Sequence, residues 1–171
     1  MFLYQGEELG LEEAEVPPKD RQDPLYKVSG GREAGRDGCR VPLPWHKGQP
    51  NAGFSTVAPW LPMPAGWDSL AVDAQAGSAG SMLVFYKGAL ALRRSLAGTQ
   101  PGRLRWRTAP EGILVYEHGR LTVAVNFLAR AVDLPARGRV LIASDALAMF
   151  RNGRLTLPAN SGAWLDRLAG T

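Results

Sequence analysis

Short apolar runs, broken every few residues by Gly, Pro, Asn or Asp, fill the region from residue 103 to residue 166, and they limit the fold most. Apolar and polar residues alternate within the runs, which is typical of strands. EHGR at 117–120 indicates one tight turn, and the Asn152–Gly153 pair indicates a second. Six or seven antiparallel strands at this spacing predict a small β-sandwich or half-barrel. The runs are RLRWRT, GILVYEH, RLTVAVNFL, AVDLP, GRVLIASD, GRLTLP and GAWLDRL.

One amphipathic helix is predicted before these runs, in SAGSMLVFYKGALALRRSL. Ser78 is the expected N-cap, and Arg93 and Arg94 suit the negative C-terminal end. Gly98 and Pro101 are expected to end the helix. Apolar residues at steps of three and four form a stripe along one face. Further apolar residues beside the stripe make this face broad, so the helix should pack against more than one neighbour. The stripe is Met82, Phe85, Tyr86, Ala89, Leu92 and Leu96, and Leu83, Val84 and Leu90 lie beside it.

A long segment without helix or strand periodicity precedes the helix, GREAGRDGCRVPLPWHKGQPNAGFSTVAPWLP at 31–62. Loops longer than about 15 residues in compact domains tend to be functional. This one carries aromatic residues interleaved with prolines, which must be buried or must stack on a flat, partly apolar ligand such as a sugar ring. Charged residues beside them offer donors and acceptors for hydroxyl groups. The aromatic residues are Trp45, Phe54, Trp60 and, just beyond, Trp67; the charged ones are Arg36, Asp37 and Arg40.

The net charge of +4 and the pI near 9.6 do not indicate a nucleic-acid partner, because the arginines of the later half are dispersed. Arg103, Arg105 and Arg107 alternate with Leu104 and Trp106, as on the solvated face of a strand. A single Cys excludes an internal disulfide. No leader and no apolar run of about 20 residues is present, so we expect a cytoplasmic protein without a membrane partner.

The residues alone do not predict an active site. Glu7 and Glu8 are adjacent, and adjacent side chains of an extended segment point in opposite directions, whereas a retaining glycosidase needs two facing carboxyl groups. Two histidines, His46 and His118, are too few for a histidine-based metal site, and Cys39 near His46 is weak evidence for a thiolate pair. No phosphate-binding loop occurs. We therefore expect no metal and no cofactor.

Several motifs in order resemble the C-terminal third of α-amylase-type glycoside hydrolases. The nearest subgroup contains the α-glucosidases and oligo-1,6-glucosidases, together with trehalulose- and sucrose-converting relatives. The resemblance covers nearly the whole chain. It rests on FLYQGEELGL, GCRVPLPW, PNAGFS, PWLP and SMLVFYKGALALRR, and on VNF, GRVLIASD and AWL for the C-terminal β-domain of that family.

The resemblance implies an α/β fragment followed by an all-β domain. Residues 1–98 would form the last βα unit of a TIM (β/α)₈ barrel, with Phe2–Tyr4 as the end of the eighth strand and the helix at about 79–97 as the eighth helix. The loop after that strand would lie at the C-terminal face, where barrel active sites are built. Residues 99–171 would form a small antiparallel β-sandwich.

The same resemblance assigns substrate-binding residues. Arg40 matches the family's Arg in an RxPxxW pattern that reaches the glucose hydroxyls. Glu8 matches a family Glu near the aglycone side, with Glu7 as the alternative equivalent, and Trp45 would be a wall of the cleft. Pro44 stands where many relatives carry Gln, so contacts through that amide are lost.

The resemblance also implies that the catalytic Asp, Glu and Asp of a retaining α-glucosidase precede Met1. The chain would then be a fragment, inactive alone, that acts on oligosaccharide only with the rest of the barrel. A truncated or frameshifted gene, a misplaced start codon, or a split enzyme with a complementary N-terminal fragment would each explain it. The alternative is a stand-alone carbohydrate-binding or scaffolding β-module.

Overall fold

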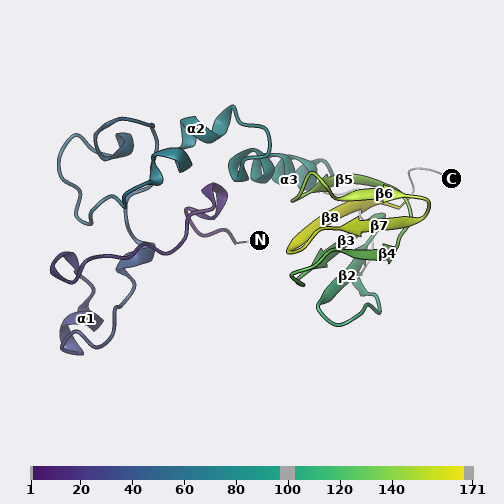
Figure 1. Ribbon diagram of the computed structural model, residues 1–171, viewed down its shortest axis with the longest axis horizontal. Coiled ribbons are helices and arrows are strands. Elements are labelled where there is room, and N and C mark those ends of the chain that lie inside the picture. Colours follow the sequence, from purple (N-terminus) through teal and green to yellow (C-terminus); the bar gives the residue numbers. More distant parts are fainter. Residues whose placement is uncertain (1, 97–102, 168–171) are drawn as a thin grey trace. The chain divides into compact units, whose positions relative to one another are not determined.

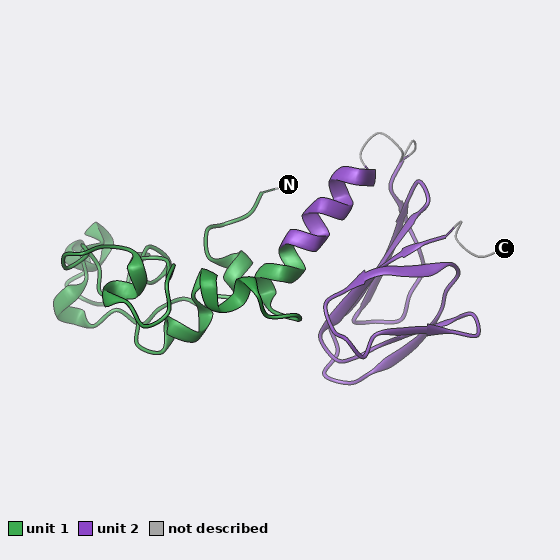
Figure 2. Cartoon of the chain, turned by 90° about the horizontal axis from the view of Figure 1, so that it is seen from above, with its two compact units in different colours: residues 1–86 green, residues 87–171 purple. Residues whose placement is uncertain are grey.

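The computed structural model describes residues 2–96 and 103–167. Figure 1 shows the helices and strands along the chain, which divides into two compact units, residues 1–86 and 87–171 (coloured in Figure 2). Among the described residues, no helix has both the length and the apolar character that crossing a membrane requires.

The first unit consists of short helices joined by long loops (Figure 1). Its main hydrophobic cluster is small, with Val16, Val41 and Leu61 buried and Ala14 and Trp67 packed against them. The elements are η1 (Glu7–Leu9), η2 (Pro18–Asp20), α1 (Pro24–Val28), η3 (Asp37–Cys39), η4 (Pro50–Gly53), η5 (Trp67–Leu70), α2 (Val72–Ala76) and the first turn of α3 (Met82–Leu96). Residues 2–4 adopt no strand, since no described segment of this unit pairs with them.

Gln75 joins three of these segments. Its side chain is buried, and Nε2 donates to the carbonyl oxygens of Leu9 and Leu70, each at 2.9 Å. Its Oε1 accepts from the backbone N–H of Leu83 at 3.1 Å. One amide therefore satisfies backbone groups of η1, η5 and α3 that would otherwise be buried without partners.

Helix α3 begins at Met82, and Ser81 rather than Ser78 is its N-cap. The Ser81 hydroxyl accepts from the N–H of Val84 at 3.2 Å, which satisfies one of the free donors of the first turn. Ser78 lies too early, because its carbonyl accepts from the N–H of Ser81 in a preceding turn. Arg93 and Arg94 lie in the last turn as expected. Gly98 and Pro101, which were predicted to end the helix, lie outside the described residues.

Replacing Ser81 with Ala is expected to weaken the first turn of α3 by about 1 kcal/mol, because the Val84 N–H loses its acceptor. Amide hydrogen exchange of residues 82–86 measures this local loss. Ser78→Ala is the control and should leave the same amides unchanged. Equal effects of the two variants would contradict the cap assignment.

Only one apolar position of α3 is fully covered. Leu83 is buried, although the sequence pattern places it beside the main stripe. The stripe itself is half-buried, apart from Met82, whose side chain is exposed. We expected this broad apolar face to pack against several neighbours. Among the described residues, most of the face remains only half-buried. The half-buried stripe residues are Phe85, Tyr86, Ala89, Leu92 and Leu96.

The described residues of the second unit form eight strands in two antiparallel sheets, of order β1-β2-β3-β8-β5 and β4-β7-β6. Each of the seven runs predicted from the sequence contains a strand. An eighth strand, β6, was not predicted. The strands are β1 (Arg105–Trp106), β2 (Ile113–His118), β3 (Leu121–Asn126), β4 (Val132–Pro135), β5 (Arg139–Ala143), β6 (Met149–Arg151), β7 (Arg154–Leu157) and β8 (Ser161–Asp166).

Both predicted tight turns are confirmed. Residues 119 and 120 join β2 to β3, with His118 opposite Leu121. Asn152 and Gly153 join β6 to β7, with φ angles of 51° and 72°. An Asn-Gly pair adopts two such positive φ angles at low cost, and the turn matches the twist of the flanking strands.

The two sheets share one hydrophobic core, because buried side chains of β3, β4, β7 and β8 form a single cluster. Its members are Ala124, Leu134, Leu155, Leu157, Ala163 and Leu165. The edge strand β1 does not follow the predicted alternation. Leu104 and Trp106 are exposed like the three arginines that alternate with them, and Trp106 makes an edge-to-face contact with Tyr116 at 5.6 Å between ring centroids.

Candidate functional site

A cavity of about 410 Å³ in the first unit brings together two of the residues singled out in the sequence, Arg40 and Trp45. Its walls are apolar and aromatic apart from Gln5 and Arg40. The remaining lining residues are Val41, Pro42, Leu43, Phe54, Pro59, Trp60 and Leu61. An apolar cavity with few polar groups is the usual form of a small-molecule site.

Three aromatic side chains at this cavity are open to solvent. Trp45, Phe54 and Trp60 are 45%, 49% and 66% exposed, whereas Trp67 packs against the buried cluster of the unit. Three exposed aromatic rings around one cavity offer flat apolar faces to a ligand. Of the two roles considered for these aromatics, Trp67 is partly buried against the core cluster, and the other three rings are open for stacking.

The backbone around Trp45 is fixed on both sides. Its N–H donates to the carbonyl of Ala52 at 2.8 Å, and its carbonyl accepts from the N–H of Asp73 at 3.2 Å. Asn51 and Ala52 have φ angles of 48° and 47°, which reverse the chain and bring the Ala52 carbonyl back to Trp45. The Trp45 side chain therefore projects from a loop whose backbone is fixed by hydrogen bonds.

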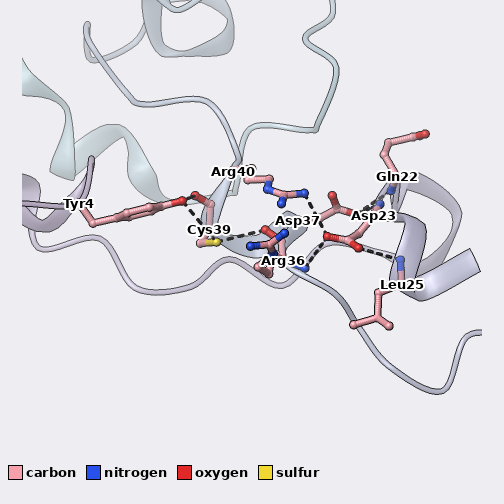
Figure 3. A network of polar contacts seen from close by, with 8 residues as sticks. All are labelled: Tyr4, Gln22, Asp23, Leu25, Arg36, Asp37, Cys39 and Arg40. Atoms are coloured by element: carbon pink, nitrogen blue, oxygen red, sulfur yellow. Dashed lines mark hydrogen bonds and ion pairs between the residues drawn. The ribbon is translucent and has the colours of Figure 1, made fainter. Parts of the chain in front are cut away.

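Arg40 is held at the cavity by an ion pair with Asp23 (Figure 3). Arg40 Nη1 donates to Asp23 Oδ2 at 3.0 Å, and the Asp23 side chain is only 6% exposed. The same carboxylate accepts from the backbone N–H groups of Leu25 and Arg36, at 2.8 and 2.9 Å. Asp23 is also the N-cap of α1, so it fixes both the start of that helix and the position of the Arg40 side chain.

Asp37 is a structural residue, and its predicted part in hydroxyl recognition is wrong. It is 1% exposed, and its Oδ2 accepts from the N–H groups of Gln22 and Asp23 at 2.6 and 2.8 Å (Figure 3). Within residues 2–96 and 103–167, its Oδ1 has no hydrogen-bond partner. A carboxylate buried against two backbone donors cannot also face a ligand in the cavity.

Glu7 and Glu8 lie on η1, a single turn of 3₁₀ helix, and not in the extended segment that we expected. Glu8 is half-buried, and its Oε2 accepts from the N–H of Gly6 at 2.9 Å. Glu7 is exposed and lines a neighbouring cavity of about 260 Å³, which Tyr4 and Cys39 also line. Neither glutamate lines the cavity of Arg40 and Trp45, and in the described part of the chain no cluster of three metal-binding side chains occurs.

The pKa of the Asp23 carboxyl is held below its ordinary value of 3.8, mainly by the N–H of Arg36, then by that of Leu25, with Arg40 acting in the same direction. A depressed pKa means that the stabilisation is complete above the ordinary value and is lost as the pH falls through the lowered pKa. We expect the Arg36 and Leu25 amide signals to shift only below about pH 3.8. Carboxyl ¹³C NMR titration measures this pKa, and a value at or above 3.8 would contradict the assignment.

The family assignment follows from comparison with known proteins. The family described as "Alpha amylase, catalytic domain" matches residues 1–100, which is more than half of the chain. The chain belongs to the α-amylase family. The predicted resemblance to its α-glucosidase and oligo-1,6-glucosidase subgroup is confirmed by the relatives that match.

Two curated relatives of this α-amylase family chain carry glucosidase names. A probable alpha-glucosidase of Rhizobium meliloti is 39% identical over 104 residues, which are 61% of this chain and 19% of that protein. A probable oligo-1,6-glucosidase 3 of Bacillus subtilis is 31% identical over 111 residues, covering 55% of this chain and 20% of that protein. The chain therefore spans about a fifth of the length of these relatives.

Solved structures of the α-amylase family match nearly all of the chain. The alpha-glucosyl transfer enzyme XgtA is 32% identical with a TM-score of 0.80, over 95% of this chain and 32% of that one. The trehalulose synthase MutB of Pseudomonas mesoacidophila MX-45 also has a TM-score of 0.80, with 21% identity, over 95% of this chain and 34% of that one. At this identity the match supports a shared fold and nothing more. The helices followed by antiparallel sheets thus agree with the coarse fold expected for this family.

Proposed function

We propose that this chain is the C-terminal part of a retaining α-glucosidase that hydrolyses the α-glucosidic bonds of short oligosaccharides. Residues 1–98 supply the last βα unit of the barrel and residues 99–171 its C-terminal β-domain. The observation that supports this most is the meeting of Arg40 with three exposed aromatic rings at one cavity, in a chain of the α-amylase family. In this proposal the cavity is one wall of the substrate site.

Each proposed site residue has a distinct part. Arg40 donates charge-assisted hydrogen bonds to glucose hydroxyls, and Trp45 provides an apolar wall for the sugar ring. Glu8, or Glu7 beside it, faces the aglycone side. The chemistry of retention needs a nucleophilic and an acid/base carboxyl about 5–5.5 Å apart. We assign both carboxyl groups to barrel segments outside this chain. These segments belong either to an upstream part of the same enzyme or to a complementary N-terminal fragment.

A chimera tests this proposal. The matching segment of the Rhizobium meliloti relative is replaced by this chain, and hydrolysis of 4-nitrophenyl α-D-glucoside is measured for the chimera and for the 171-residue chain alone. We expect the folded chimera to hydrolyse the substrate and the chain alone to stay at the blank rate. Hydrolysis by the chain alone would contradict the division of catalytic groups. A folded but inactive chimera would contradict the glucosidase assignment.

A stand-alone carbohydrate-binding module is the second candidate, and the open aromatic rings at the cavity favour it. Such a module binds its ligand without help from a barrel. Titration of the chain with isomaltose, followed by Trp fluorescence, separates the two functions. A dissociation constant below about 0.1 mM would favour the module, and weaker binding would favour the incomplete glucosidase site.

A further inference from the structure

We propose that Asp23 is the positioning residue for Arg40, holding its guanidinium so that the unused N–H groups face the ligand. The inference rests on the proposed function for the part that Arg40 plays. It adds a residue that lies 17 positions earlier in the chain and does not itself line the cavity. Neither the motifs nor the family resemblance had singled it out.

The contacts of Arg40 show which of its donors are engaged. In the described part of the chain, the guanidinium makes one hydrogen bond, from Nη1 to Asp23 Oδ2. The Nε–H and the Nη2 protons have no partner among those residues. A guanidinium is a rigid planar fork with five N–H donors, so fixing one nitrogen fixes the direction of the others. Arg40 therefore presents a directed set of donors at the cavity.

Asp23 can serve as this anchor because hydrogen bonds and close packing hold it in place. Its own N–H donates to Asp37 Oδ2 at 2.8 Å, and its two carboxylate oxygens accept from Leu25 and Arg36. Gly35 lies against it so closely that a Cβ there would be 2.5 Å from Asp23 Cβ and Cγ. The carboxylate is thus buried and hydrogen-bonded through both oxygens, which is the support that a side chain at a binding site needs to keep its geometry.

Such an anchor lowers the conformational entropy that the Arg40 side chain loses when a ligand binds. An unpaired Arg side chain samples many rotamers, and a ligand that binds it must then order it. The ion pair with a buried carboxylate removes most of that freedom before the ligand arrives. Loss of the Asp23 carboxylate should therefore weaken ligand binding almost as much as loss of Arg40 itself.

The test uses the 171-residue chain and isomaltose as the probe, with binding followed by NMR. Asp23→Ser is the main variant, because Ser keeps an N-cap oxygen for Leu25 but removes the charge and the second oxygen. Asp20→Asn is the matched control, since the Asp20 side chain makes no hydrogen bond or ion pair with other described residues. Arg40→Ala and the Asp23→Ser/Arg40→Ala double variant complete a cycle. The ¹⁵N–¹H signals of the Arg40 guanidinium report directly whether the group is held.

We expect Asp23→Ser and Arg40→Ala each to weaken isomaltose binding about tenfold, the double variant to be no weaker than Arg40→Ala, and Asp20→Asn to be unchanged. The Arg40 guanidinium signals should be resolved in the wild type and averaged in Asp23→Ser. Full binding by Asp23→Ser, or a further loss in the double variant, would overturn the positioning role and leave the proposed function standing. If Arg40→Ala binds isomaltose as tightly as the wild type, the part that the proposed function gives to Arg40 fails. If the wild type itself does not bind, the stand-alone module is contradicted and the incomplete glucosidase site stands. The guanidinium signals then still decide whether Asp23 holds Arg40.

Discussion

Replacing Asn126 with Ala is expected to destabilise the unit of residues 87–171 by at least about 3 kcal/mol. Asn126 is fully buried, and its Nδ2 donates to the carbonyl oxygens of Arg130 and Pro158 at 2.8 and 2.7 Å, and to that of Leu157 at 3.3 Å. Its Oδ1 accepts from the N–H of Leu128 at 2.9 Å. The variant leaves these backbone groups, which join the end of β3 to the end of β7, without their partner.

Thermal unfolding measured by circular dichroism checks this prediction. For a unit of this size, about 3 kcal/mol corresponds to a melting temperature lower by roughly 12–24 °C. Asn126→Asp should be at least as harmful, because a carboxylate cannot donate and is repelled by the carbonyl oxygens. Asn152→Gly is the control, since that exposed turn residue has a positive φ that Gly adopts freely. A melting temperature within about 3 °C of the wild type for Asn126→Ala would contradict the structural role.

The sequence predicted the β-unit well because two-residue alternation and tight turns are local signals. The Asn152–Gly153 turn is an example, since its two positive φ angles follow from the residue types alone. Strand β6 was missed because Met149–Arg151 is only three residues long and its residue types, Met, Phe and Arg, do not alternate between apolar and polar. It is a strand because the turn folds it back onto β7. The exposure of Trp106 was not predicted either. It depends on the position of β1 at the edge of a sheet, which the local sequence does not show.

The candidate site was predicted only in part. Arg40 and Trp45 are five residues apart on one irregular loop, so the motif that contains them already placed them together. Asp23 was missed, because a contact between residues 17 positions apart, in a segment of short helices and loops, produces no periodic pattern in the sequence. The one local signal was Asp before Pro24, which is typical of an N-cap followed by Pro at the first helical position. Asp37 was misjudged, since residue type alone cannot tell a buried carboxylate that caps backbone donors from an exposed one.

Replacing Arg40 with Ala in the active chimera is expected to lower kcat/KM for 4-nitrophenyl α-D-glucoside about 100-fold, the loss of about 2.7 kcal/mol of transition-state binding. Hydrogen bonds from a charged donor are worth about 1.5–3 kcal/mol, and the Nε and Nη2 groups of Arg40 are the donors that remain for the sugar. Truncation also leaves Asp23 as a buried carboxylate without its cation. The steady-state rates of the chimera and its variants measure the effect.

Two further variants separate a sugar contact from a structural role. Arg40→Lys keeps the charge but loses the planar fork, so it should pair with Asp23 and fold normally while recovering only part of the activity. Arg32→Ala is the matched control, because that exposed side chain lies eight residues away, donates to the Ser29 carbonyl and does not line the cavity. We expect Arg32→Ala to retain kcat/KM within about twofold and Arg40→Lys to lie between wild type and Arg40→Ala. Unchanged hydrolysis by a folded Arg40→Ala chimera would remove Arg40 from the substrate site, and the cavity would then have no charged donor for a glucose hydroxyl among its lining residues.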